Sequence, residues 1–332
     1  MERVAFLCAL VGLVATLVAT PKWICKAPTI GLVGPDMNKP GKPKVPEMGG
    51  ICVVFGFVMG SLAYIGYQTF YHGSLNYTPV LAALCTVLMA CIIGIMDDLL
   101  GWKAGLWQWQ KPIFTLFAAM PMIVINAGQT TMELPLLGHV SWGLLYPLAI
   151  VPIGIIGASN SFNMIAGYNG LEAGMGVIML STLGYVGLVT GNTIATALSL
   201  IMAGALLSFL YFNWYPARIF PGDTMTYSVG SLIACVAILG NMEKIGVMLF
   251  IPYAVDFIIQ ARGMFRKEAF ARVNEDGSLE KPYKGTYHLM HLALAVLRRV
   301  KEKVYERDVV LFVWGVEMVA AGSSLYVFYK MS

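Results

Sequence analysis

The chain has 332 residues, of which 58% are hydrophobic and 12% charged, and its mean hydropathy is +0.72. An ordinary soluble domain carries about 25% charged residues, so this composition excludes one and places most of the chain in lipid. The net charge of +4 is small, so we expect no nucleic-acid partner. The six cysteines form no C-x-x-C pair, and neither a disulfide framework nor a zinc site is expected.

Long uncharged runs predict an all-α polytopic membrane protein. A membrane-crossing helix needs roughly 20 apolar residues, and the runs 48–96 and 173–217 are each long enough for two. The first run is interpreted as a span rather than a signal peptide, because it lacks a strongly basic start and further spans follow. We therefore expect one integral membrane domain over residues 1–332, with about ten transmembrane helices. They lie near residues 4–20, 50–70, 78–96, 112–127, 141–158, 174–190, 193–212, 224–240, 244–262 and 309–329.

The basic residues are distributed very unevenly between the two sides that these spans define. Loops after the odd-numbered spans hold Lys22, Lys26, Lys39, Lys42, Lys44, Lys103, Lys111, Arg218 and eleven residues between Arg262 and Arg307, which makes 19 of the 22 lysines and arginines. The other side has Arg3, Lys244 and Lys330. The positive-inside rule then predicts that the odd-span loops are cytoplasmic and that both termini lie outside.

The segment at about 264–308 is the one sizeable cytoplasmic insertion. Residues 287–307 have helical apolar spacing and a basic face, which predicts an amphipathic helix on an anionic membrane surface. This stretch contains His288 and His291. A surface histidine pair is the favoured interpretation, with a phosphate contact as the alternative.

Asp97 and Asp98 close the third span. Two adjacent carboxylates at a membrane edge repel each other unless a cation or a shared proton relieves the repulsion, and ionisable residues at this depth mark functional sites by default. A solvated helix end that merely stops insertion is an equally weighted alternative when the pair is taken alone.

Polar amides end the fifth span. Asn160 and Asn163 would share one helix face, where their amide groups can meet a hard cation or phosphate oxygens. Gly167 and Gly170 follow and allow close backbone approach to a ligand. The alternative is an ordinary helix C-terminus with Asn and Gly in its turn.

Gly222 and Asp223 precede the eighth span and resemble a helix N-cap, which is an equally weighted alternative at this position. Asp223 would nevertheless lie at the same depth as Asp98 and Asn163. Three oxygen donors from three span ends predict one magnesium site with open positions for a pyrophosphate.

These segments together resemble the polyprenyl-phosphate N-acetylhexosamine-1-phosphate transferases, and most closely their dolichyl-phosphate N-acetylglucosamine-phosphotransferase branch. The matching segments occur in order at cytoplasmic edges: Asp36–Lys39 with Val45–Glu47, Gly94–Asp98, Asn160–Glu172 and Asn213–Thr224. The resemblance implies transfer of N-acetylglucosamine 1-phosphate from UDP-N-acetylglucosamine to a polyprenyl phosphate such as dolichyl phosphate. It also implies Mg²⁺, with Mn²⁺ as a substitute.

The resemblance further implies residue roles. It places metal ligands at Asn163 and Asp223, catalytic residues at Asp97, Asp98, Lys111 and Asn160, and substrate contacts at Asn38, Glu47, Gly167, Asn169, Phe220, Arg266 and Lys267. Phe220 would stack on uracil, and Arg266 or Lys267 would meet the pyrophosphate. The last cytoplasmic loop differs from the patterns of two branches of this family. It has neither the His-Ile-Pro-Arg-like stretch of the eukaryotic branch nor the histidine-rich run of the bacterial muramyl-pentapeptide branch.

Two alternatives stay open beside this function. A transferase of the same fold with another UDP-sugar would serve cell-envelope glycan synthesis, and a transporter would also bury carboxylates, although near the membrane midplane. An archaeal cell membrane is favoured over the endoplasmic reticulum because long outside loops are absent. A homodimer is compatible with the sequence but not required by it.

Overall fold

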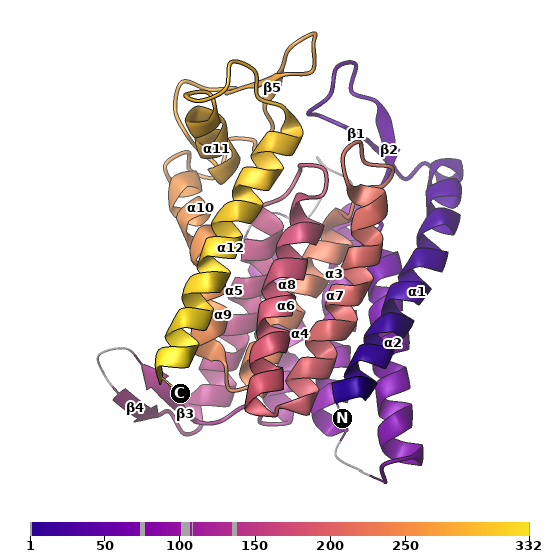
Figure 1. Cartoon of the computed structure of the whole chain (residues 1–332), viewed down its shortest axis with the longest axis vertical. Coiled ribbons are helices and arrows are strands. Elements are labelled where there is room, and N and C mark those ends of the chain that lie inside the picture. The colour runs from indigo at the N-terminus through magenta and orange to yellow at the C-terminus, as the bar shows by residue number, and fades with distance from the viewer. Residues whose placement is uncertain (1, 74–76, 101–106, 108, 135–137, 332) are drawn as a thin grey trace.

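A computed structural model describes residues 2–73, 77–100, 107, 109–134 and 138–331. It is a bundle of long helices that run along one axis (Figure 1). The helices are α1 (Glu2–Lys26), α2 (Gly50–Phe70), α3 (Thr78–Leu100), α4 (Gln110–Val124), α5 (Val151–Met164), α6 (Leu171–Thr190), α7 (Thr193–Asn213), α8 (Gly222–Leu239), α9 (Glu243–Leu249), α10 (Ile251–Ala261), α11 (Leu289–Leu297) and α12 (Glu306–Met331). A 3-10 turn, η1 (Ala27–Ile30), follows α1, and a π-helical turn, η2 (Tyr146–Ile150), leads into α5.

The prediction of an all-α membrane protein is confirmed, and every expected span falls on helical structure. Within the described part of the chain, eight helices are long and apolar enough to cross a membrane, and the bent pair α9–α10 would make a ninth. α4 is a shorter apolar helix of 15 residues. Lys103, which entered the charge count, lies outside the described residues.

The ninth expected span is not one straight helix. α9 and α10 meet at Phe250 with a bend of 49°. Pro252 stands at the start of α10, where it has no N–H to donate to the preceding turn. The ladder of backbone hydrogen bonds is therefore interrupted there, and the chain changes direction.

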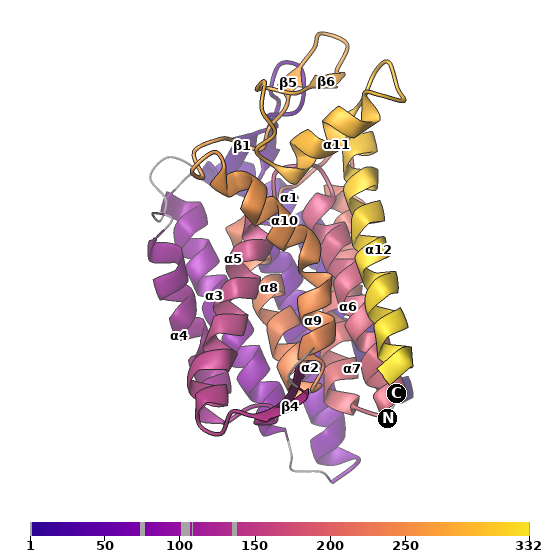
Figure 2. The same ribbon diagram turned by 90° about the vertical axis from the view of Figure 1, so that its left-hand side faces the viewer.

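The two ends of the bundle differ in what they carry. The described residues form three short antiparallel hairpins: β1 (Val33–Pro35) with β2 (Lys44–Pro46), β3 (Thr131–Leu134) with β4 (Gly138–Ser141), and β5 (Arg272–Val273) with β6 (Leu279–Glu280). β1, β2, β5, β6 and α11 lie at one end, called the loop end below (Figure 2). Both termini and the β3–β4 hairpin lie at the other end.

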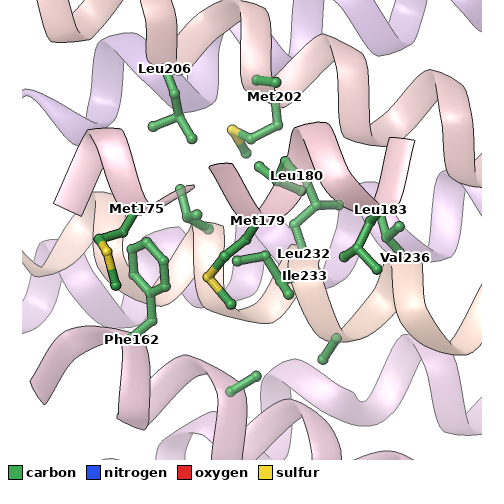
Figure 3. Close-up of a cluster of buried hydrophobic side chains, with 14 of the residues drawn as sticks. Phe162, Met175, Met179, Leu180, Leu183, Met202, Leu206, Leu232, Ile233 and Val236 are labelled. Atoms are coloured by element: carbon green, nitrogen blue, oxygen red, sulfur yellow. The ribbon is translucent and has the colours of Figure 1, made fainter. Parts of the chain in front are cut away.

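The core is a continuous set of buried apolar side chains with members from α1 through α12. Its centre lies among α5, α6, α7 and α8, where methionine and leucine side chains interdigitate with Phe162 (Figure 3). α8 is the most enclosed of the candidate spans, with 83% of its apolar window buried. The N-terminus of α8 is therefore held from several sides.

The prediction of an amphipathic helix over residues 287–307 is wrong in length, because the observed helix is shorter. α11 ends at Leu297, and α12 begins only at Glu306. The Arg298 guanidinium donates to the Leu279 carbonyl (3.2 Å) and the Glu280 carboxylate (3.0 Å), so the chain turns toward β6 where a longer helix would have continued.

The prediction of a surface histidine pair is also wrong. His288 is 5% exposed and His291 is fully buried, because α11 packs against α10 and α12. His288 Nε2 lies 2.8 Å from the Lys267 carbonyl oxygen. Burial lowers the pKa of the His291 imidazole to about 4, with the nearby His288 as a smaller cause.

Candidate functional site

Four helix ends meet at the loop end and bring the predicted polar residues together. α3 and α5 end there, whereas α4 and α8 begin there. The packing of α3 on α8, α4 on α5 and α5 on α8 fixes these ends relative to one another. Residues from positions 97, 111, 163 and 223 therefore share one site.

Lys111 is the centre of this site. Its ammonium lies 2.6 Å from Asp97 Oδ2 and 3.2 Å from Asp223 Oδ2, and it also lies 5.8 Å from the centre of the Tyr227 ring. Asp97 is buried, whereas the Lys111 and Asp223 side chains are 23% and 28% exposed. One positive charge thus compensates the negative charges of two carboxylates from different helices. The cluster is accessible to solvent at Lys111 and Asp223.

The two amides of α5 lie on the flank of this cluster. Asn163 Nδ2 donates to Asp223 Oδ2 (3.3 Å), and its Oδ1 accepts from the Thr226 hydroxyl (2.8 Å). Asn160 Nδ2 donates to the Thr115 hydroxyl (2.9 Å) and to the Ile156 carbonyl (2.8 Å). Asn163 is thus directly bound to Asp223, while Asn160 is tied to α4 one turn after Lys111.

Asp98 contacts the start of α8. Its carboxylate accepts hydrogen bonds from the backbone N–H groups of Asp223 (2.8 Å) and Thr224 (3.0 Å) and from the Thr224 hydroxyl (2.6 Å). The adjacent aspartates therefore have different partners: Asp97 pairs with Lys111, and Asp98 binds the N-terminus of α8.

Glu47 and Phe220 are brought next to each other by backbone pairing. The Phe220 N–H donates to the Pro46 carbonyl (2.7 Å), and the Gly49 N–H donates to the Phe220 carbonyl (2.9 Å). Both side chains are partly exposed. Burial raises the pKa of the Glu47 carboxyl, and the Asp98 charge raises it further. Glu47 therefore interacts electrostatically with a carboxylate of the site.

A second polar cluster, the Lys39 cluster, joins four separate segments beneath the surface. The Lys39 ammonium contacts Asp36, Asn169 and Glu306, the last at 3.2 Å. Its charge also lies 4.5 Å from the centre of the Tyr215 ring. Asp36 and Glu306 are each only 2% exposed. This single lysine offsets both buried carboxylates.

Asn169 and Asn38, predicted as substrate contacts, have their side chains bound within the protein. Asn169 is 3% exposed and accepts from the Ala217 N–H (2.8 Å), while its backbone N–H donates to Glu306 (2.7 Å). Asn38 donates to the Gly167 carbonyl (3.1 Å) and accepts from the Ala271 N–H (3.1 Å). Both residues hold the loops around the site in position, and their substrate contacts stay a prediction.

Gly167 adopts a conformation that favours glycine. Its φ is +106°, and a Cβ there would lie 2.9 Å from the Phe270 ring. Its N–H donates to the buried Glu172 carboxylate (2.8 Å). The loop between α5 and α6 is therefore fixed by its own backbone conformation and by Glu172.

Arg266 and Lys267 are exposed at the loop end. The Lys267 ammonium lies 4.9 Å from the centre of the Tyr283 ring, and its backbone carbonyl meets His288. The structure thus associates Lys267 with the α11 segment. The predicted pyrophosphate contact stays a prediction for both residues.

The residues around Lys111 fit a magnesium ion. Among the residues that the structure describes, no group of three or more His, Cys, Asp or Glu side chains forms a ready metal site. Mg²⁺ usually needs only one or two protein carboxylates, because water and substrate phosphates fill the other positions. Asp97 and Asp223 both contact Lys111, and the Asn163 amide adjoins Asp223 through its Nδ2 while its Oδ1 accepts from Thr226. The two carboxylates are therefore oxygen donors of the kind that Mg²⁺ binds.

Several residues at the site were not predicted from the sequence. They are Thr115, Thr224, Thr226, Tyr227 and Glu306, and all of them contact a predicted site residue. Helical spacing was a usable signal for Thr226, three residues after Asp223. Glu306 was detectable as a carboxylate at the start of an apolar span.

A bundle of membrane-spanning helices with carboxylates, an ammonium group and amides at one end defines an integral membrane enzyme. Comparison with known proteins identifies its class. Residues 80–241 match the family described as Glycosyl transferase family 4.

Relatives of the same kind match between 70% and 95% of the chain. A Sulfolobus acidocaldarius protein, provisionally named a UDP-N-acetylglucosamine–dolichyl-phosphate N-acetylglucosaminephosphotransferase, is 36% identical over 95% of this chain and 93% of its own. The Dictyostelium discoideum protein of that name is 31% identical over 70% of this chain and 66% of its own. A phospho-N-acetylmuramoyl-pentapeptide-transferase of Streptococcus thermophilus is 26% identical over 94% of each chain. The chain therefore belongs to the glycosyl transferase family 4 of polyprenyl-phosphate sugar-1-phosphate transferases, and the resemblance seen in the sequence is confirmed.

Proposed function

We propose that this protein transfers N-acetylglucosamine 1-phosphate from UDP-N-acetylglucosamine to a polyprenyl phosphate such as dolichyl phosphate. The observation that carries the proposal is the Lys111 ammonium between Asp97 and Asp223 at the end of a membrane bundle. A soluble nucleotide and the phosphate of a membrane lipid can both reach that depth. The names of the relatives support the two substrates.

The reaction exchanges one phosphoanhydride bond for another. An oxygen of the lipid phosphate forms a bond to the β-phosphorus of the UDP-sugar, and the bond from that phosphorus to the α-phosphate oxygen breaks. UMP leaves with the bonding electrons, and the product is a lipid pyrophosphate that carries the sugar. Phosphoryl transfer mainly requires positioning and charge neutralisation, which the residues of this site can supply.

Lys111 is the residue with a charge suited to the developing negative oxygens. Its ammonium is partly exposed, and Asp97 and Asp223 hold it from two helices. Asp97 is the member of the aspartate pair that contacts the lysine, so we assign to it the placement of the acceptor phosphate or of its residual proton. Magnesium bound at Asp223 and Asn163 would neutralise charge on the pyrophosphate.

Phe220 and Glu47 are the proposed substrate contacts on the adjoining surface. An aromatic ring can stack on uracil, and Phe220 is partly exposed two residues before α8. Glu47 is held beside it by the backbone pairing of residues 46–50 with 220–221. We therefore propose that the nucleoside binds near the N-terminus of α8.

We propose direct attack by the lipid phosphate rather than a phospho-sugar intermediate on an aspartate. The Asp98 carboxylate is occupied by three hydrogen bonds, and Asp97 is paired with Lys111. A two-step enzyme would exchange labelled UMP into the UDP-sugar without any lipid, whereas a single-displacement enzyme would not. Lipid-free exchange near the rate of turnover, in protein freed of bound lipid, would contradict direct attack.

The active site is proposed to face the cytoplasm, because the basic loops gather at the loop end. An archaeal cell membrane is the proposed location, and the Sulfolobus relative is archaeal.

The decisive experiment is an assay of the purified protein with Mg²⁺, polyprenyl phosphates and a panel of UDP-sugars. We expect label from UDP-N-acetylglucosamine to appear in lipid together with an equal amount of UMP. Transfer of a different sugar would keep the reaction class and correct the donor. Accumulation of intact UDP-sugar inside liposomes, without labelled lipid, would instead show a transporter.

A further inference from the structure

The adjacent residues Asp97 and Asp98 make different contacts. Asp97 pairs with Lys111 of α4, whereas Asp98 accepts from three donors of α8. One Asp98 oxygen accepts from the Asp223 N–H, and the other accepts from both the N–H and the hydroxyl of Thr224. The first N–H groups of a helix have no partner within the helix, so Asp98 caps α8 from a different helix.

The contact between α3 and α8 is built for close approach. A Cβ on Gly94 would lie 2.5 Å from both the N and the Cα of Thr224, and a Cβ on Gly222 would lie 2.5 Å from Asp98 Oδ2. Larger residues at these two positions would separate Asp98 from the N–H groups that it binds. The absence of side chains there and the three hydrogen bonds serve the same contact.

We infer that Asp98 is a positioning residue, which holds the N-terminus of α8 so that Asp223 faces Lys111 and Asn163. The inference rests on the proposed role of Asp223 in metal and pyrophosphate binding. Asp223 is the second residue of α8, and its own N–H is one of the bound groups. Asp98 therefore acts on the reaction through Asp223 and does not touch the lipid phosphate.

Thr224 contributes to the same cap of α8. Its hydroxyl makes the shortest of the three bonds, and the residue is fully buried. Thr224→Val removes this donor with little change of shape. It should therefore weaken the cap without leaving a cavity, which separates loss of positioning from loss of packing.

The cap is tested first without any activity measurement. Hydrogen exchange of the peptide that contains residues 222–225 is followed by mass spectrometry in the intact protein and in Asp98→Ala. Since loss of a capping side chain weakens a helix start appreciably, we expect about fivefold faster exchange at the start of α8. Thr182→Val is the matched control, because it removes a buried hydroxyl that donates within α6. Unchanged exchange in Asp98→Ala would overturn the cap.

Activity then decides what the cap does. Asp98→Asn and Thr224→Val should raise the Mg²⁺ concentration for half-maximal turnover and lower kcat, with the KM for polyprenyl phosphate unchanged. Asp98 and Thr224 act on one contact, so their effects should not add. The double variant Asp98→Ala/Thr224→Val should therefore have a kcat no lower than that of Asp98→Ala alone. A raised KM for the lipid at unchanged Mg²⁺ dependence would show that Asp98 touches the acceptor. If the wild-type protein transfers no sugar, the proposed function fails, and the exchange experiment still decides the cap.

Discussion

Asp223 has the most specific set of partners at the site. Its carboxylate contacts Lys111 and Asn163, and its backbone N–H donates to Asp98. Its position early in α8 alone would be consistent with a simple helix cap. The contacts with charged and amide groups from three other helices support our proposal that it is a functional residue held in place by Asp98.

Asp223→Asn and Asn163→Ala should each remove most turnover while the protein stays folded. Loss of a ligand to a charge-neutralising Mg²⁺ removes several kcal/mol from the transition state, which corresponds to orders of magnitude in rate. A role in helix capping alone would cost only about 1 kcal/mol of stability. Turnover at several Mg²⁺ concentrations, measured beside the melting temperature, tests this. Near-normal activity of Asp223→Asn at low Mg²⁺ would exclude it as a ligand.

Phe220→Ala should weaken binding of uridine nucleotides by about tenfold or more, since stacking on a base contributes roughly 1–3 kcal/mol. Phe220→Tyr keeps the ring and should bind nearly as well as the wild type. Calorimetry with UMP on the three proteins is the measurement. Equal affinities would mean that the ring only packs against the neighbouring loops.

At the scale of elements, the loop end is held together by buried charges rather than by apolar packing alone. The Lys39 cluster joins the segment before β2, the loop before α6, the α7–α8 connection and the start of α12. Lys39 is important for stability because its two carboxylate partners, Asp36 and Glu306, are almost fully buried.

Lys39→Met should destabilise the protein by about 3–5 kcal/mol, because it leaves two buried carboxylates without their cation. The added substitution Glu306→Gln removes one of these charges and should recover part of the loss. Lys42→Met is the matched control, since Lys42 is exposed and surface substitutions usually change stability by less than about 0.5 kcal/mol. Unfolding in detergent would be followed for all four proteins. Equal stability of the Lys39 and Lys42 variants would contradict this role.

The burial of His291 should make the α11 segment sensitive to acid. Its pKa is lowered to about 4 in the folded protein, below the ordinary value of 6.5. The unfolded chain then binds more protons than the native one between these two values. The stabilisation is complete above pH 6.5 and is lost as the pH falls toward 4. The melting temperature of the wild type should therefore fall more steeply over this range than that of His291→Gln. His72→Gln is the control, since His72 is exposed, and it should follow the wild type.

At the scale of the whole molecule, the charge asymmetry agrees with the shape. The segments with most of the basic residues gather at the loop end, and both termini lie at the opposite end (Figure 1). Lys42 and Arg272 are exposed near the loop end, and Thr131 is exposed near the termini.

Cysteines introduced at positions 42 and 272 should be labelled from the cytoplasmic side, and a cysteine at position 131 only from outside. The physical reason is the preference of lysine and arginine for the cytoplasmic side. The measurement uses a membrane-impermeant reagent on intact cells and on inverted vesicles, in a background without native thiols. Labelling of position 131 only from the cytoplasm would reject the predicted orientation.

The apolar runs and the distribution of charge were enough to predict the class of protein and the positions of its helices. Apolar runs specify membrane helices because lipid offers no partner to backbone polar groups, so each run must satisfy them internally. For the same reason the polar span ends at Asp97, Asn163 and Asp223 were visible as a candidate site. The bend at Phe250 was missed because its cause, Pro252, lies in an otherwise continuous apolar run.

Which partner each site residue contacts could not be predicted without knowing how the helices pack. Adjacent residues on a helix point in directions about 100° apart, so the sequence could not show that Asp97 faces Lys111 while Asp98 faces α8. The burial of His291 and the shared cation of the Lys39 cluster likewise depend on segments far apart in the chain. Such contacts form only when the helices pack, and they determine which polar residues reach the substrate side and which hold the others in place.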